Sequence, residues 1–222
     1  WHYTETMSEH SNTPETPAIQ PRHVFSSLPK YAAGKPPTPV EGLKQYKLSS
    51  NENPHGPIPE VARILSEFDA THRYPDPLST KLRTALAHRL GVDAHNIVTG
   101  AGSLGALNQI LKAFAGASLD GTQDEVIYAW RSFEAYPILV GLLGAKSVQI
   151  PNLPNGAHDL NAMAQAVTDR TRVILVCTPN NPTGPVVTEA QMRELLTKIP
   201  ENVVVVIDEA YYEFCTASTV PA

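Results

Sequence analysis

The chain has 222 residues, 42% of them hydrophobic and 18% charged, which is typical of a soluble globular protein. Its formal net charge is -5 and it has no run of lysine or arginine, so nucleic acid and anionic membranes are not expected partners. No apolar stretch approaches the roughly 20 residues that span a bilayer. The two cysteines, Cys177 and Cys215, lack metal-ligand spacing, and so few cysteines indicate a reducing compartment. Composition therefore favours small-molecule chemistry without a metal.

The amino-terminal third of the chain is expected to be irregular. Residues 1–23 are polar and rich in Thr, Glu, Ser and Pro, which predicts a disordered tail. They lack the apolar core of a secretory signal and the arginines of a transit peptide, so we expect a cytoplasmic protein. Prolines in residues 24–77 predict an extended arm that begins a small domain, with one helix at 59–68.

Residues 78–222 predict the main domain. Leucines recur every four residues from Leu78 to Leu90, which indicates an amphipathic helix that stops at Gly91. The continuous apolar run 203–207 is typical of a strand covered on both faces. Strands are expected at 96–99, 125–129, 146–150, 172–177 and 202–208, and helices at 104–114, 133–143, 160–167 and 189–197. This alternation predicts an α/β fold, a mostly parallel sheet with helices on both faces.

Ligands of such sheets bind at the carboxyl ends of the strands, and the first candidate motif there is TGAGSLGA, residues 99–106. A glycine turn before a helix can hold a phosphate through backbone N–H groups, and Ser103 can add a hydroxyl. Residues 100–105 also match the dinucleotide pattern G-x-G-x-x-G, but Glu125 begins the next strand instead of ending it. An NAD(P)-dependent oxidoreductase and a purely structural turn remain alternatives.

Two further motifs follow buried strands. In TPNNPTG, residues 178–184, either the asparagines and Pro182 simply make a rigid loop, or Asn181 donates a hydrogen bond to a ligand oxygen. Asp208 ends the apolar run 203–207, where a charge is costly unless it is paired or hydrogen-bonded. We expect Asp208 either to have a cationic or protonated partner or to cap the loop that follows.

A phosphate cradle, an amide donor and a buried acid beside a phenol suit pyridoxal phosphate. The phosphate of this cofactor needs a helix start, and its pyridine nitrogen needs an acid that keeps it protonated. Its phenolic oxygen needs donors such as Asn181 and Tyr211.

The segments SSNENPHGP, RYPDP, CTPNNPTGPV and VVVIDEAYYEF, in this order, resemble the fold-type I aminotransferases. The branch they resemble contains histidinol-phosphate aminotransferase and aromatic amino acid aminotransferases, and the resemblance runs from about residue 24 to the end. It implies that Asp208 pairs with the pyridinium nitrogen and that Asn181 and Tyr211 bind the ring oxygen. It also places the phosphate at Gly102, Ser103 and Leu104.

The resemblance implies further contacts. Phe133 would stack on the cofactor ring, although an ordinary core aromatic is the alternative. Tyr74 would reach the cofactor phosphate of a partner subunit, which implies a homodimer with shared active sites. Tyr31 and Asn53 would approach the substrate.

The lysine that this family joins to the cofactor, downstream of DEAY in a Ser-x-Ser-Lys or Leu-Ser-Lys context, has no counterpart in this chain. We therefore expect these residues to be an incomplete large domain without the carboxyl-terminal small domain, inactive alone. A non-catalytic fragment is the alternative for the polypeptide itself.

The substrate expectation rests on the same resemblance. Leu104 and Gly105 stand where histidinol-phosphate enzymes commonly carry Asp-Glu, and WRSFEAYP resembles the aromatic branch. We expect transfer of an amino group between an aromatic amino acid and a 2-oxo acid such as 2-oxoglutarate. Histidinol phosphate is the alternative substrate.

Overall fold

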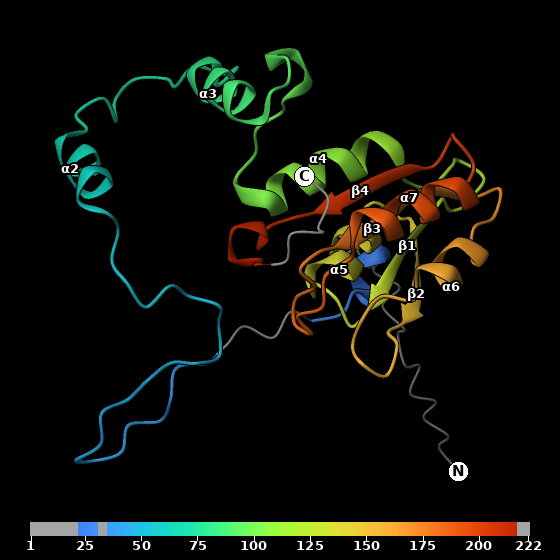
Figure 1. Ribbon diagram of the computed structural model, residues 1–222, viewed down its shortest axis with the longest axis horizontal. Helices are drawn as coiled ribbons and strands as arrows, with labels where there is room; N and C mark the ends of the chain where they lie inside the picture. The colour runs from blue at the N-terminus through green and yellow to red at the C-terminus, as the bar shows by residue number, and fades with distance from the viewer. Residues whose placement is uncertain (1–21, 31–34, 217–222) are drawn as a thin grey trace, which may run out of the picture.

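The computed structural model describes residues 22–30 and 35–216, and its centre is a parallel sheet (Figure 1). The 4-stranded sheet has the order β2-β1-β3-β4. All of its neighbouring strands run parallel. The strands are β1 Glu125–Trp130, β2 Lys146–Pro151, β3 Thr171–Cys177 and β4 Val204–Asp208. The predicted α/β class is therefore confirmed.

Helices cover both faces of the sheet. Alternate residues of β1 and β3 point to opposite faces, so each strand supplies both cores. On one face Val126 and Leu175 pack with α4 Gly102–Phe114 and α5 Ala135–Leu142. On the other, Ile127 and Ile174 pack with α6 Leu160–Gln165 and α7 Glu189–Lys198. Two covered faces explain the continuous apolar runs of these strands.

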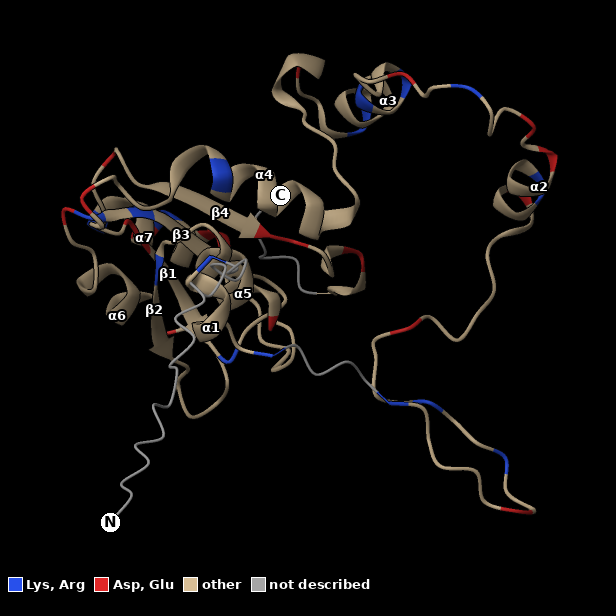
Figure 2. Cartoon of the chain, turned by 180° about the vertical axis from the view of Figure 1, so that it is seen from behind, with Lys and Arg blue, Asp and Glu red and all other residues tan. Residues whose placement is uncertain are grey.

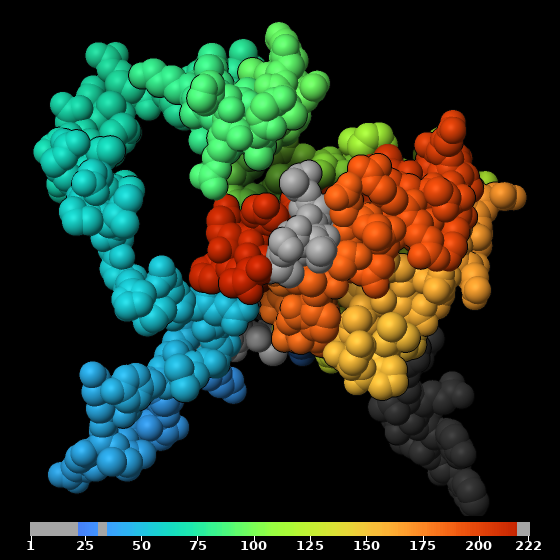
Figure 3. Space-filling model, viewed as in Figure 1, coloured from blue at the N-terminus to red at the C-terminus, as the bar shows by residue number. Residues whose placement is uncertain are grey.

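Before the sheet, α1 Val24–Ser27 lies against α5, whereas residues 35–96 form an arm that carries α2 Pro59–Glu67, α3 Thr80–Leu90 and the 3-10 turn η1 Ala94–Asn96. Ribbon and space-filling views show it looping away from the sheet (Figures 1 and 3). Its lysines and arginines are interspersed with acidic residues (Figure 2). Large apolar side chains on and beside α2 are exposed, among them Ile64, Leu65 and Phe68. Among the described helices, none combines the length and hydropathy needed to cross a membrane.

The strand predicted at 96–99 is wrong. The chain there leaves η1 in an extended, unpaired conformation, and Val98 is 70% exposed. A strand needs a hydrogen-bonded neighbouring strand, and no strand in the described part of the chain pairs with this segment. The helix predicted at 133–143 begins only at Ala135, so Phe133 lies in the preceding loop. Likewise, α3 begins at Thr80 and excludes Leu78.

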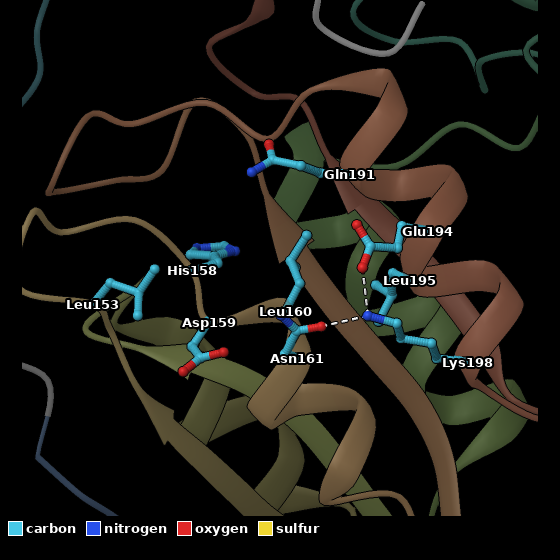
Figure 4. A pocket seen from close by; sticks show the side chains of 9 residues that line it. All are labelled: Leu153, His158, Asp159, Leu160, Asn161, Gln191, Glu194, Leu195 and Lys198. Atoms are coloured by element: carbon cyan, nitrogen blue, oxygen red, sulfur yellow. Dashed lines mark hydrogen bonds and ion pairs between the residues drawn. The ribbon is translucent and has the colours of Figure 1, made fainter.

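A small cavity of about 130 Å³ lies between α6 and α7 (Figure 4). Lys198 Nζ donates to Asn161 Oδ1 and to Glu194 Oε1, each at 2.5 Å, and joins the two helices. The buried His158 ring lines the same cavity, and neither of its nitrogens forms a hydrogen bond of normal geometry with a described residue. Burial, only partly offset by the nearby Asn180, lowers the pKa of His158.

His158 therefore makes stability depend on pH. The unfolded chain takes up a proton near pH 6.5 whereas the folded protein resists it, so stability is lost as the pH falls below about 6.5. Between pH 7.5 and 5.5, we expect the free energy of unfolding of His158→Leu to fall by up to about 1 kcal/mol less than that of the wild type. Urea unfolding at both pH values measures this difference. An equal loss in the two proteins would contradict it.

Candidate active site

The ends of β3 and β4 place two of the predicted motifs side by side. Cys177 pairs with Asp208 in the sheet register, and Thr178 N donates to Asp208 O at 2.9 Å. The loop containing TPNNPTG therefore starts next to the acid that ends β4.

Asp208 has a protonated partner. The Tyr136 hydroxyl donates to Asp208 Oδ2 at 2.6 Å, and Ala210 N donates to Oδ1 at 3.2 Å. Burial and the nearby negative charges raise the pKa of Tyr136, so this phenol stays a donor. The carboxylate thus receives a short, charge-assisted hydrogen bond and also caps the following loop. Sequence required such a partner, but nothing in it identified Tyr136, which lies on α5.

Asn181 and Tyr211 meet through a residue that was not predicted. Asn51 Nδ2 donates to Tyr211 Oη at 3.1 Å and to Asn181 Oδ1 at 3.4 Å. The predicted arm residue, Asn53, instead accepts from His55 N at 3.0 Å, which caps its own turn. The segment SSNENP contains both Asn51 and Asn53, and the sequence alone could not show which of the two asparagines contacts Tyr211.

A cavity of about 380 Å³ lies where the arm meets the segment after β4. In Figure 3 the arm rejoins the body beside this red segment. The residues that line this cavity are Asn51, Glu52, Asn53, Pro54, Tyr211 and Phe214. Asn53 therefore lies near Tyr211 even though its carboxamide is engaged elsewhere. Tyr31 lies outside the described residues.

The start of α4 borders Asp208. Ser103 and Asp208 line one cavity of about 280 Å³. Gly102 has φ +66°, and a Cβ at Gly100 would lie 2.5 Å from Ala106 N. These glycines let the chain turn tightly into the helix, whose first N–H groups, from Gly102 to Leu104, have no acceptor within the helix.

Phe133 and Tyr74 have different surroundings. Phe133 precedes α5 and packs edge-on against Tyr136, with ring centroids 5.6 Å apart. It is therefore close to the partner of Asp208. Tyr74 is fully exposed on the arm, and this single chain does not bring it to the strand ends.

Asn180 holds the loops together instead of facing a ligand. Its side chain is buried, accepts from Ser132 Oγ at 2.7 Å, and donates to Arg131 O at 3.0 Å and Thr183 Oγ1 at 2.6 Å. Thr183 Oγ1 then donates to Gly156 O at 2.8 Å. One asparagine thus ties together the loops after β1, β2 and β3.

The donor set fits pyridoxal phosphate. A helix start suits its phosphate, a hydrogen-bonded carboxylate suits a protonated ring nitrogen, and an amide and a phenol suit its ring oxygen. In the described part of the chain, no group of His, Cys, Asp and Glu could hold a metal ion.

The two neighbouring asparagines should differ in their contribution to stability. Asn180→Ala leaves buried partners unsatisfied and should lower the free energy of unfolding by about 1–3 kcal/mol. Asn181→Ala removes a partly exposed amide and should change it by about 0.5 kcal/mol or less. Denaturant unfolding of both variants measures this, and equal losses would contradict the structural role of Asn180.

Known proteins resemble the chain over most of its length. The family model Aminotransferase class I and II matches residues 44–222. An aromatic amino acid aminotransferase of Streptomyces coelicolor is 48% identical over 201 residues, which are 90% of this chain and 54% of that protein. The enzyme of the same name from Thermobifida fusca is 47% identical over the same shares. The chain thus spans about half the length of these relatives.

Solved structures agree with the fold. Histidinol-phosphate aminotransferase from Sinorhizobium meliloti, in complex with pyridoxal-5'-phosphate, matches with a TM-score of 0.67 and 27% identity over 75% of this chain and 44% of that one. N-succinyldiaminopimelate aminotransferase from Mycobacterium tuberculosis gives a TM-score of 0.57 and 30% identity, over 67% of this chain and 41% of that one. With this fold, these strand-end motifs and matches over most of its residues, the chain belongs to the class I and II aminotransferases.

Proposed function

We propose that this chain forms the cofactor-binding part of a pyridoxal phosphate-dependent aromatic amino acid aminotransferase. The observation that carries the proposal is the convergence of Asp208, Asn181 and Tyr211 at one edge of the sheet, with the start of α4 bordering Asp208. Its family membership and its relatives' names support it.

Each residue has a proposed task. The amides of Gly102, Ser103 and Leu104 bind the phosphate, and Phe133 lies against the ring. Asp208, held by Tyr136, keeps the pyridine nitrogen protonated, while Asn181 and Tyr211 donate to the ring oxygen. Bound pyridoxal phosphate supplies the electron sink for loss of the substrate's α proton.

The proton-transferring lysine is proposed to lie outside these 222 residues. Among the described residues, no lysine lines the cavity containing Asp208 or the cavity containing Tyr211. Proton transfer at the substrate's α carbon needs such a base within reach. The isolated chain is therefore proposed to be inactive.

The proposed substrates are an aromatic amino acid and a 2-oxo acid such as 2-oxoglutarate. The names of relatives at 48% and 47% identity favour this over histidinol phosphate, whose enzyme from Sinorhizobium meliloti is 27% identical.

We also propose a cytoplasmic homodimer. The exposed position of Tyr74 and the uncovered apolar residues on α2 are consistent with an arm that contacts a second subunit. In that arrangement Tyr74 reaches the phosphate bound by the partner. Asn53 and Tyr31 are proposed to approach the substrate.

Asp208→Asn in the full-length protein should lower kcat by about 100-fold or more, because a neutral amide cannot stabilise a protonated ring nitrogen. Tyr136→Phe should lower it by about tenfold, the effect of losing one hydrogen bond to a charged group. The assay follows phenylalanine with 2-oxoglutarate, and thermal unfolding checks that both variants fold.

Near-normal turnover by Asp208→Asn would contradict the assigned role. The same assay with histidinol phosphate separates the two substrate classes. A higher kcat/KM for histidinol phosphate than for phenylalanine would overturn the aromatic assignment and leave the cofactor site in place.

A further inference from the structure

One carboxamide from the arm contacts both proposed donors to the cofactor's ring oxygen. Asn51 Nδ2 lies 3.1 Å from Tyr211 Oη and 3.4 Å from Asn181 Oδ1. These contacts join segments that are 160 and 130 residues apart in the sequence. None of the site motifs predicted from the sequence required them.

The polarity of these contacts has a chemical consequence. A primary amide nitrogen only donates hydrogen bonds, whereas a phenol oxygen can accept one bond while its own hydrogen donates another. Because Tyr211 Oη accepts from Asn51, the Tyr211 hydrogen remains available. Because Asn181 Oδ1 also accepts from Asn51, the Asn181 amide turns its own NH₂ group away from Asn51.

We propose that Asn51 is a positioning residue that sets Asn181 and Tyr211 as donors toward the ring oxygen of pyridoxal phosphate. This inference rests on the proposed function of the site. Without Asn51, the Asn181 amide can rotate and present its carbonyl oxygen to the cofactor's ring oxygen, where two acceptors repel each other.

The proposal also links the arm to cofactor binding. Asn51 belongs to the extended segment that leads to α2, and its side chain contacts Tyr211 on the body. Cofactor binding therefore depends on where the arm lies, although the arm supplies none of the donors to the ring oxygen.

Replacing the donor by an acceptor tests this polarity. In the full-length protein, Asn51→Asp should draw the Tyr211 hydrogen and the Asn181 NH₂ group toward its carboxylate and away from the cofactor. We expect its Kd for pyridoxal phosphate to rise about tenfold, and that of Asn51→Ala about threefold. Fluorescence titration of the apoprotein measures these values independently of turnover.

Ser50→Asp is the matched control, because it places the same charge on the neighbouring exposed residue. It should bind the cofactor as the wild type does. Wild-type affinity in Asn51→Asp would overturn the proposal, and so would an equal loss in Ser50→Asp and Asn51→Asp. Failure of the wild type itself to bind pyridoxal phosphate would instead overturn the proposed function.

A double-mutant cycle tests the route of the effect. If Asn51 acts partly through Tyr211, Asn51→Ala should weaken cofactor binding less in a Tyr211→Phe background than in the wild type. Fully additive losses would show that the two side chains act independently and would contradict the proposal.

The visible absorption of bound cofactor should shift with pH differently in Asn51→Asp and in Ser50→Asp.

Discussion

A carboxylate placed at the end of a partly buried strand is the constraint on which the site depends. Asp208 follows the partly buried apolar residues of β4, where a carboxylate without a hydrogen-bond partner would cost free energy. The fold meets this cost with the phenol of Tyr136, which α5 delivers from the same face of the sheet. Because burial keeps Tyr136 protonated, the acid has a fixed orientation before any ligand arrives. Preorganisation of this kind is what an acid directed at a pyridine nitrogen requires.

Two neighbouring residues at the same edge of the sheet have different roles. Asn180 is buried and joins three loops, whereas its neighbour Asn181 points toward Tyr211 and the arm. Since Asn180 binds Ser132 and Arg131, it also limits the movement of the loop that carries Phe133. The two adjacent asparagines of TPNNPTG therefore differ, because Asn180 joins the loops and Asn181 is the residue proposed to contact the ligand.

Much of the fold could be predicted because β1 and β3 carry the apolar runs of parallel strands covered on both faces. The apolar run 203–207 also forms a strand, but the expected cover on both faces is wrong, because β4 lies at the edge of the described sheet and Ile207 is 37% exposed. The strand predicted at 96–99 failed because a strand needs a partner, and the local pattern contains no information about one. Tyr136 and Asn51 could not be found for a similar reason, since each acts on a residue far away in the sequence. The motifs around Asp208, Asn181 and Ser103 were recognisable because each lies at a strand or helix end. Their precise partners appeared only with the tertiary structure.

In the proposed site, Asp208 holds the ring nitrogen of pyridoxal phosphate while Asn181 and Tyr211 hold its ring oxygen. A crystal structure of the full-length protein with the cofactor tests this most directly. We expect the pyridine nitrogen within about 3 Å of an Asp208 oxygen, the ring oxygen in contact with Asn181 Nδ2 and Tyr211 Oη, and the phosphate on the start of α4. A cofactor bound elsewhere, or one whose ring nitrogen faces solvent, would contradict these roles.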